Sequence, residues 1–179
     1  MTQAANTYAQ ALYDLAKDES LAQQILKELD VLKQAFDREP EFIRLLSAPN
    51  LPKAERCGIL DESFRGSVHI YVLNFLKILT EKGYIRQFSD CCKAYRQHYN
   101  ADNGILTVQA VTAVALTEEQ SARLTEKLTK QTGKTVELVN RIDPSILGGV
   151  RLDYDGKRVD GTVKNRLDTI GNLLKNTVL

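Results

Sequence analysis

The stretch IDPSILGGVRLDYDGKRVDGTVKNRLD, residues 142–168, decides the fold. From Val150 to Tyr154, apolar and charged residues alternate with the period of a half-buried β-strand. Asp155-Gly156 then predicts a tight hairpin turn, because such a turn needs the positive φ that glycine adopts easily. The stretch therefore predicts a strand, a hairpin and a short return strand that ends at Asp160-Gly161.

The residues on either side extend this unit. Gly148-Gly149 directly before the strand indicates a bulge or a close approach of two backbone segments. After the hairpin, apolar residues recur at helical spacing and predict a closing amphipathic helix. Its apolar face holds Val163, Leu167, Ile170 and Leu174, and its polar face holds Lys164, Asp168 and Lys175.

The segment before this stretch alternates between strand and helix patterns. Asp102-Asn103-Gly104 interrupts the preceding pattern, and 105–114 is rich in Val and Thr, which favours a strand. Thr117-Glu-Glu-Gln120 is a capping box that opens a helix to about residue 132, where Gly133 ends it. A second strand is expected over 136–142.

The first hundred residues show helical patterns only, with prolines at the boundaries between helices. Helices are expected over 4–17, 20–37, 40–47, 53–63, 67–82 and 84–100. The predicted fold class is therefore α plus α/β: an N-terminal six-helix bundle over 1–104, followed by a small C-terminal α/β domain over 105–179.

Charge argues against nucleic acid as a main partner. The 24 basic and 23 acidic residues give a net charge of +1. Residues 1–104 hold 13 basic and 14 acidic residues, and the remainder holds 11 and 9. Neither part has the excess of positive charge that binding to a phosphate backbone requires.

No stretch predicts direct membrane insertion. The most apolar one, 68–79, is interrupted by polar residues and is far shorter than the roughly 20 apolar residues that span a bilayer. No secretory signal pattern opens the chain. Three cysteines, Cys57, Cys91 and Cys92, do not suit a disulfide framework or a zinc site, and reduced thiols are expected.

Motifs for catalysis, metals and cofactors fail on inspection, so none of the three is expected. Gly133-Lys134-Thr135 resembles the tail of a phosphate-binding loop, but Leu128 stands where a glycine is needed and the helix precedes the strand. Asp153-Tyr-Asp-Gly156 lacks the remaining ligands of a calcium loop. His69 and His98 stand apart from other ligand residues in the sequence.

Two helices are apolar over more of their circumference than one core needs. In the first helix, Ala5, Tyr8, Ala9, Ala11, Leu12, Tyr13, Leu15 and Ala16 cover an arc of about 200°. The fifth helix carries a similar stripe from Val68 to Leu79. Either these helices are deeply buried, or together they form an apolar groove for a partner's amphipathic helix.

The whole chain resembles the δ subunit family of F-type ATP synthases, called OSCP in mitochondria. Tyr8-Ala-Gln-Ala-Leu-Tyr-Asp-Leu-Ala16 is similar to the family's opening helix, and Leu76–Ile85 to the end of its fifth helix. The segments 142–151 and 159–167 are similar to its C-terminal signature. The match runs along the chain in the family's order.

This resemblance implies a peripheral-stalk connector that is not an enzyme by itself. The implied partners are the N-terminal helix of an α subunit, on top of the catalytic head, and the end of the b subunits. The α-subunit helix would lie between the first and fifth helices, and the b subunits would contact the C-terminal domain. The implied site residues for the α-subunit helix are Tyr8, Ala11, Leu15, Phe75, Ile78 and Lys82.

The resemblance also implies a location and a role. The protein would resist rotor torque during ATP synthesis and proton transport, as a peripheral membrane protein on the cytoplasmic face of a bacterial plasma membrane or its organellar equivalent. A small regulatory or nucleic-acid-binding adaptor is the competing interpretation, and near-neutral charge in both parts disfavours it. An enzyme is the third, disfavoured by the lack of a convergent chemical motif.

Overall fold

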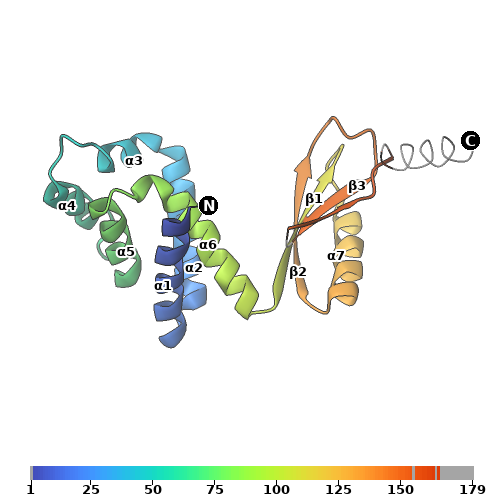
Figure 1. The fold of residues 1–179 in the computed structure, drawn as a ribbon, viewed down its shortest axis with the longest axis horizontal. Helices are drawn as coiled ribbons and strands as arrows, with labels where there is room; N and C mark the ends of the chain where they lie inside the picture. Colours follow the sequence, from blue (N-terminus) through green and yellow to red (C-terminus); the bar gives the residue numbers. More distant parts are fainter. Residues whose placement is uncertain (1, 155, 164, 166–179) are drawn as a thin grey trace, which may run out of the picture. The chain divides into compact units, whose positions relative to one another are not determined.

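The structure is a computed structural model that describes residues 2–154, 156–163 and 165. The chain divides into two units, residues 1–99 and 100–179, which are described separately below. Helices alone form the first unit, and a sheet with a helix forms the second (Figure 1). The predicted fold class, a helical bundle followed by a small α/β domain, is confirmed.

Six α-helices make up the described part of the first unit, as predicted. They are α1 (Gln3–Asp18), α2 (Ala22–Arg38), α3 (Pro40–Leu46), α4 (Lys53–Phe64), α5 (Ile70–Glu81) and α6 (Phe88–Asp102). Helix α5 begins three residues later than expected, because His69 is its N-cap and accepts a hydrogen bond at Nδ1 from the Tyr71 N–H. Helix α6 begins four residues later, after a 3₁₀ turn at Ile85–Gln87.

One hydrophobic core joins all six helices. Each contributes at least one fully buried apolar side chain: Ala9, Ile25, Leu46, Leu60, Leu76 and Tyr95, in the order of the helices. The Tyr95 hydroxyl donates a hydrogen bond to the Ala22 carbonyl at 3.0 Å, so this buried phenol has a partner. Around Phe36, the rings of Phe42, Phe64 and Phe88 pack within 6.0 Å.

The second unit is a four-stranded sheet with one described helix on one face. Its elements are β1 (Ile105–Thr112), α7 (Glu118–Thr132), β2 (Thr135–Ile142), β3 (Val150–Tyr154) and β4 (Lys157–Asp160). The strand order is β2-β1-β3-β4. Strands β1 and β2 are parallel, whereas β3 is antiparallel to both β1 and β4. Among the described residues, Leu106, Val108, Leu128 and Val136 form the core cluster of this unit, and Ala110, Val111 and Ile146 are also buried.

Local signals in the sequence explain most of this unit. The capping box at Thr117 and Gln120 is formed, and Gly133 ends α7 with a φ of 67°. The hairpin joins β3 to β4 where predicted, with Tyr154 paired to Lys157. The predicted closing helix over 163–174 lies mostly outside the described residues. Among the described residues, no helix has both the length and the apolar content to cross a membrane.

Candidate partner-binding face of the helical unit

Helix α1 exposes part of its apolar arc. Its buried side chains are Ala5, Ala9, Leu12, Tyr13 and Ala16. Beside them, Tyr8 is half-buried, Ala11 is exposed and Leu15 is 42% exposed. At 100° per residue these three residues fall within about 60° of arc. The arc noted in the sequence is therefore divided: one part faces the core, and its apolar flank faces outward.

Helix α5 has a comparable flank near its C-terminal end. Ile78 is 43% exposed, and Lys82, directly after the helix, is exposed. Phe75 is on the same side of the helix but is only 6% exposed, so it belongs mainly to the core. Tyr71 is half-buried on that side. Phe75 therefore supports the flank from beneath, and Ile78 is the side chain most available to a partner.

Two contacts tie the start of α1 to the segment that follows α5. The rings of Tyr8 and Tyr84 lie 5.7 Å apart, tilted by 48°. The Thr2 hydroxyl, which also caps α1, donates a hydrogen bond to Oε1 of Gln87. Gly83, with a φ of 77°, turns the chain between α5 and Tyr84. These contacts place the N-terminal end of α1 beside the C-terminal end of α5.

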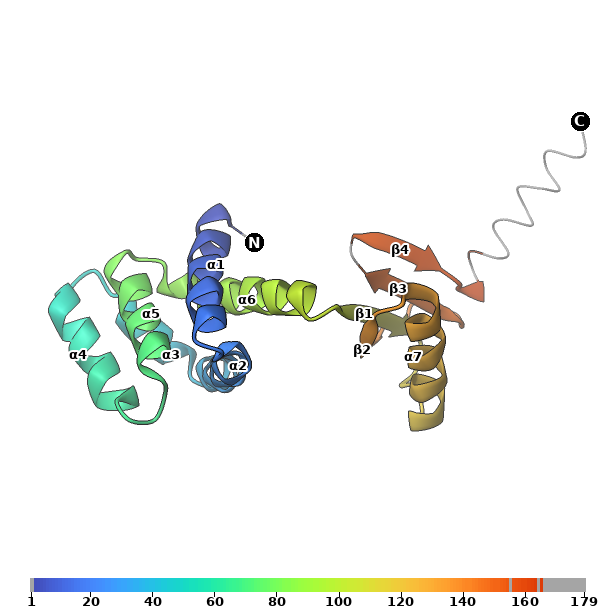
Figure 2. The ribbon, with the colours of Figure 1, turned by 90° about the horizontal axis from the view of Figure 1, so that it is seen from below.

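The two helices run in opposite directions, as both views of the ribbon show (Figures 1 and 2). Leu15 lies about 10 Å further along α1 than Tyr8, at 1.5 Å per residue. It is therefore level with the middle of α5 rather than with its end. The exposed flanks of α1 and α5 thus belong to neighbouring antiparallel helices, the arrangement a helix-binding face needs.

Two polar contacts join α4 to α5 beside this face. The Lys77 ammonium lies 2.7 Å from Asp61, and the hydrogen bond it donates holds the pKa of that carboxyl below its usual value. Cys57 lies 3.8 Å from Glu81, and burial, followed by the charge of Glu81, raises the pKa of its thiol. The face therefore offers apolar contact and carries no activated thiolate.

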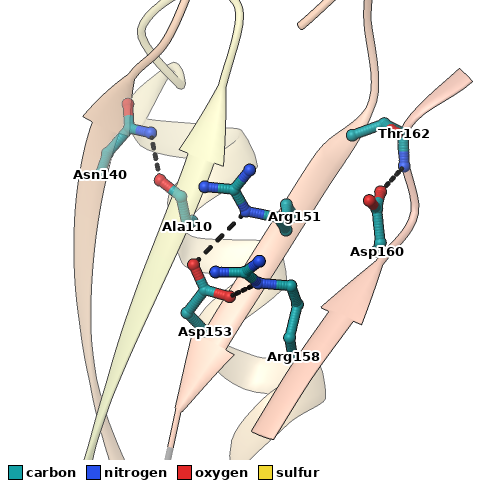
Figure 3. A network of polar contacts seen from close by, with 7 residues as sticks. All are labelled: Ala110, Asn140, Arg151, Asp153, Arg158, Asp160 and Thr162. Atoms are coloured by element: carbon teal, nitrogen blue, oxygen red, sulfur yellow. Dashed lines mark hydrogen bonds and ion pairs between the residues drawn. The ribbon is translucent and has the colours of Figure 1, made fainter. Parts of the chain in front are cut away.

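The rejected chemical motifs have structural roles. Gly133, before Lys134, is the left-handed C-cap of α7, so this segment ends a helix instead of opening one around a phosphate. Asp153 accepts hydrogen bonds from Arg158 at 2.8 Å and from Arg151 at 3.4 Å (Figure 3). The Arg158 bond is the main reason why the pKa of Asp153 is lowered. In the described part of the chain, His, Cys, Asp and Glu form no group of three that could hold a metal ion.

Sequence reasoning missed the residues that fix the face. Tyr84 was taken only as the start of the sixth helix, yet its ring packs on Tyr8. Thr2 and Gln87 are 85 residues apart in sequence, and no local pattern predicts the hydrogen bond between them. A tyrosine directly after a helix-ending glycine was the one available signal.

Comparisons with known proteins agree with this architecture. The model of the ATP synthase delta (OSCP) subunit family matches residues 4–174. ATP synthase subunit delta of Alkaliphilus oremlandii is 33% identical over 172 residues, covering 96% of each chain. The subunit of the same name from Lactobacillus delbrueckii subsp. bulgaricus is 35% identical over 174 residues, covering 95% of this chain and 94% of its own.

A solved structure shares the fold at low sequence identity. A chain in the cryo-EM structure of the Toxoplasma gondii mitochondrial ATP synthase hexamer superposes with a TM-score of 0.76 at 18% identity. The match covers 97% of this chain and 98% of that chain. The chain therefore belongs to the ATP synthase delta (OSCP) subunit family, the non-catalytic peripheral-stalk subunits of F-type ATP synthases.

Proposed function

We propose that residues 1–104 hold the catalytic head by binding the N-terminal helix of an α subunit along the exposed flanks of α1 and α5. One observation carries this proposal: Leu15 and Ile78 remain more than 40% exposed on the apolar flanks of neighbouring helices. Exposed apolar side chains on adjacent helices suit the apolar stripe of an amphipathic partner helix.

The six proposed contact residues have different roles. Leu15 and Ile78 offer apolar surface, and Ala11 leaves room for close approach of a helix. Tyr8 is held by Tyr84, which fixes its ring before the partner arrives. Phe75 shapes the floor, and Lys82 supplies a cation at the end of α5.

The second part of the proposal assigns the other end of the connection. Residues 105–179 contact the b subunits of the peripheral stalk, so that the chain joins the head to the stalk and resists rotor torque. The complex would place it at the cytoplasmic face of a bacterial plasma membrane, or at the equivalent organellar face. Membership of the delta (OSCP) family over 4–174 supports both assignments.

Two substitutions on one helix test the face that binds the head. Ile78→Asp places a charge in the proposed interface and should weaken binding to the isolated head roughly 10-fold to 100-fold, because the carboxylate loses hydration without gaining a partner. Ile70→Asp is the matched control: Ile70 is 54% exposed on the same helix but about 80° away from Ile78. Both variants should keep the helical circular-dichroism signal.

The binding measurement on Ile78→Asp, with Ile70→Asp as its control, can contradict the proposal in the following ways. Calorimetry that finds equal affinity for Ile78→Asp and the unaltered chain would exclude this face. Equal weakening by Ile70→Asp would show that charge alone, and not its position, reduces binding. Loss of the helical signal would mean that Ile78 is needed for folding.

A fragment tests the division of labour. Residues 1–105 include the whole helical unit and its core, so they should still capture the head. They should not capture the soluble part of the b subunit, whereas the full chain should. Equal capture of b by the fragment and the full chain would overturn the assignment of residues 105–179.

A further inference from the structure

The way the chain enters and leaves the sheet determines how the second unit carries force. Helix α6 ends at Asp102, and Gly104, with a φ of 62°, turns the chain into β1. The Gly104 carbonyl already accepts the hydrogen bond of the Thr135 N–H at 3.1 Å. A pull applied through α6 therefore reaches the sheet at the start of β1.

Strand β1 is an interior strand. It pairs with β2 over eight positions, from Ile105 to Thr112, and with β3 over the last four of these. On the β2 side, the Asn140 side chain donates a hydrogen bond to the Ala110 carbonyl at 2.9 Å (Figure 3). It donates another to the Thr112 hydroxyl, also at 2.9 Å. The strand that first receives the load is thus bonded to β2 along its whole length and to β3 along its second half.

The chain leaves the sheet at the opposite end. Strand β3 is antiparallel to both β1 and β4, so β4 runs parallel to β1. The start of β1 and the end of β4 therefore lie at opposite ends of the sheet. Backbone pairing continues past β4: the Gly161 N–H donates to the Val150 carbonyl, and the Val163 N–H to the Gly148 carbonyl, both at 3.0 Å.

We propose that the second unit is a shear-loaded sheet: a pull between α6 and the segment after β4 acts along the strands and loads their hydrogen bonds together. The bonds of an antiparallel ladder are perpendicular to the strands, so a pull along the strands must slide many pairs at once. A pull across the strands breaks the pairs one after another. The topology therefore gives high resistance along the direction in which the chain is connected.

Charged side chains reinforce the last ladder. Asp153 on β3 and Arg158 on β4 occupy directly paired positions, and their side chains are joined at 2.8 Å (Figure 3). Asp160 accepts from the Thr162 N–H at 2.9 Å and fixes the backbone as it leaves β4. The resistance of the sheet to shear goes beyond the proposed attachment to the b subunits. It is a property of the chain itself, whichever partner applies the force.

Two handle positions on the full chain test the proposal. Ala101→Cys with Val163→Cys attaches handles at opposite ends of the sheet. Ala101→Cys with Lys157→Cys directs more of the pull across the strands, because Lys157 directly follows the β3–β4 turn and is level with the middle of β1. Cys57→Ser is added to both, and the buried Cys91 and Cys92 stay shielded from the coupling reagent. Ala101, Val163 and Lys157 are all exposed.

Optical tweezers, used at one loading rate, measure the mean force at which the second unit opens. The length of chain released identifies this opening event. The opening force depends on the unfolding rate along the pulled direction. The mean opening force should be at least roughly twofold higher for the opposite-end pair (101 and 163) than for the pair at 101 and 157. Urea unfolding should give the two variants equal stability. Equal or lower force for the opposite-end pair, at equal stability, would overturn the proposal.

The outcome is independent of the proposed function. Capture of the b subunit uses the unaltered chain and tests attachment, whereas the force ratio tests only the topology of the sheet. Failure of one measurement leaves the other unchanged.

Discussion

The helical unit and the sheet unit are held together by different means. The buried core of the helical unit draws on all six helices and includes Phe36, Tyr13 and Tyr95. Among its described residues, the sheet unit buries seven apolar side chains, and its strands are joined by ladders and by polar side-chain links such as Asn140 to Ala110. Among the described residues, the first unit therefore has the larger apolar core, and the second combines a smaller core with paired strands and polar links.

This difference suits the two tasks in the proposed function. A packed bundle keeps α1 and α5 in fixed positions, so that an apolar flank can face outward without collapsing. Under the shear-loading proposal, the paired strands of the second unit resist a pull along their length. The predictions below ask whether each unit depends on the feature assigned to it.

The largest effect should come from the helical core. Leu76 is fully buried on α5, and Leu76→Ala should lower the free energy of unfolding of the helical unit by about 2–5 kcal/mol through lost burial and the cavity left behind. Hydrogen exchange on the full chain, resolved by mass spectrometry, should show faster exchange in α1–α6 alone. Equal acceleration in β1–β4 would show that the two units unfold as one.

A smaller effect should come from backbone contact in the sheet unit. Gly149 has a φ of 86°, and a Cβ placed there would lie 2.5 Å from the Gly161 carbonyl oxygen. Gly149→Ala should therefore lower the stability of the sheet unit by about 1–3 kcal/mol. Gly156→Ala is the matched control, because it also has a positive φ, of 71°, but no atom lies within 4 Å of the added Cβ.

Hydrogen exchange separates the two glycine variants. Gly149→Ala should accelerate exchange in β3 and β4 more than Gly156→Ala does. Equal effects would mean that the positive φ alone determines how much stability the alanine substitution removes, and that the close approach of residues 149 and 161 is not important. Unchanged exchange in the helical unit is expected for both variants.

Local patterns predicted the elements of both units well. The hairpin and the capping box at Thr117 were predictable, because each depends on residues near one another in sequence. Of the two alternatives predicted at Gly148-Gly149, a bulge or a close backbone approach, the structure shows a close approach of Gly149 to Gly161. The start of α5 was misplaced, since the Val68 region reads as apolar helix although His69 caps it. The sequence could not reveal which part of an apolar arc is buried.

The candidate site shows this limit most clearly. Helical spacing grouped Phe75 with Ile78, yet the structure buries the first and exposes 43% of the second. That division depends on where α1, α2 and α4 pack around α5, and α1 and α2 are distant from α5 in sequence. The Tyr8–Tyr84 contact depends on the same long-range packing. The family resemblance proposes the face, and the packing shows which of its proposed residues are exposed and which are buried.

The smallest effects should come from pH, with opposite directions for the two units. In the sheet unit, hydrogen bonds to Ser145, Arg158 and Thr162 are the main causes of lowered pKa values at Asp143, Asp153 and Asp160, respectively. A lowered carboxyl pKa contributes stability above its unfolded value, near 4, and this contribution is lost as the pH falls through the folded value. Acid should therefore accelerate opening of the sheet unit.

In the helical unit, stability is lost at high pH instead of low pH. Burial raises the pKa of Cys91 to about 11, and it raises the pKa values of Cys92 and Tyr95 further. Groups with raised pKa values contribute full stability below their unfolded values, and the contribution is lost as the pH rises through the folded values. Urea unfolding followed by helical circular dichroism should show stability falling as the pH rises from about 9 towards 11, and Cys91→Ala should make that fall less steep. An unchanged slope in Cys91→Ala would show that Cys91 does not contribute to the alkaline loss, and a sheet unit that weakened in parallel would remove the contrast between the two units.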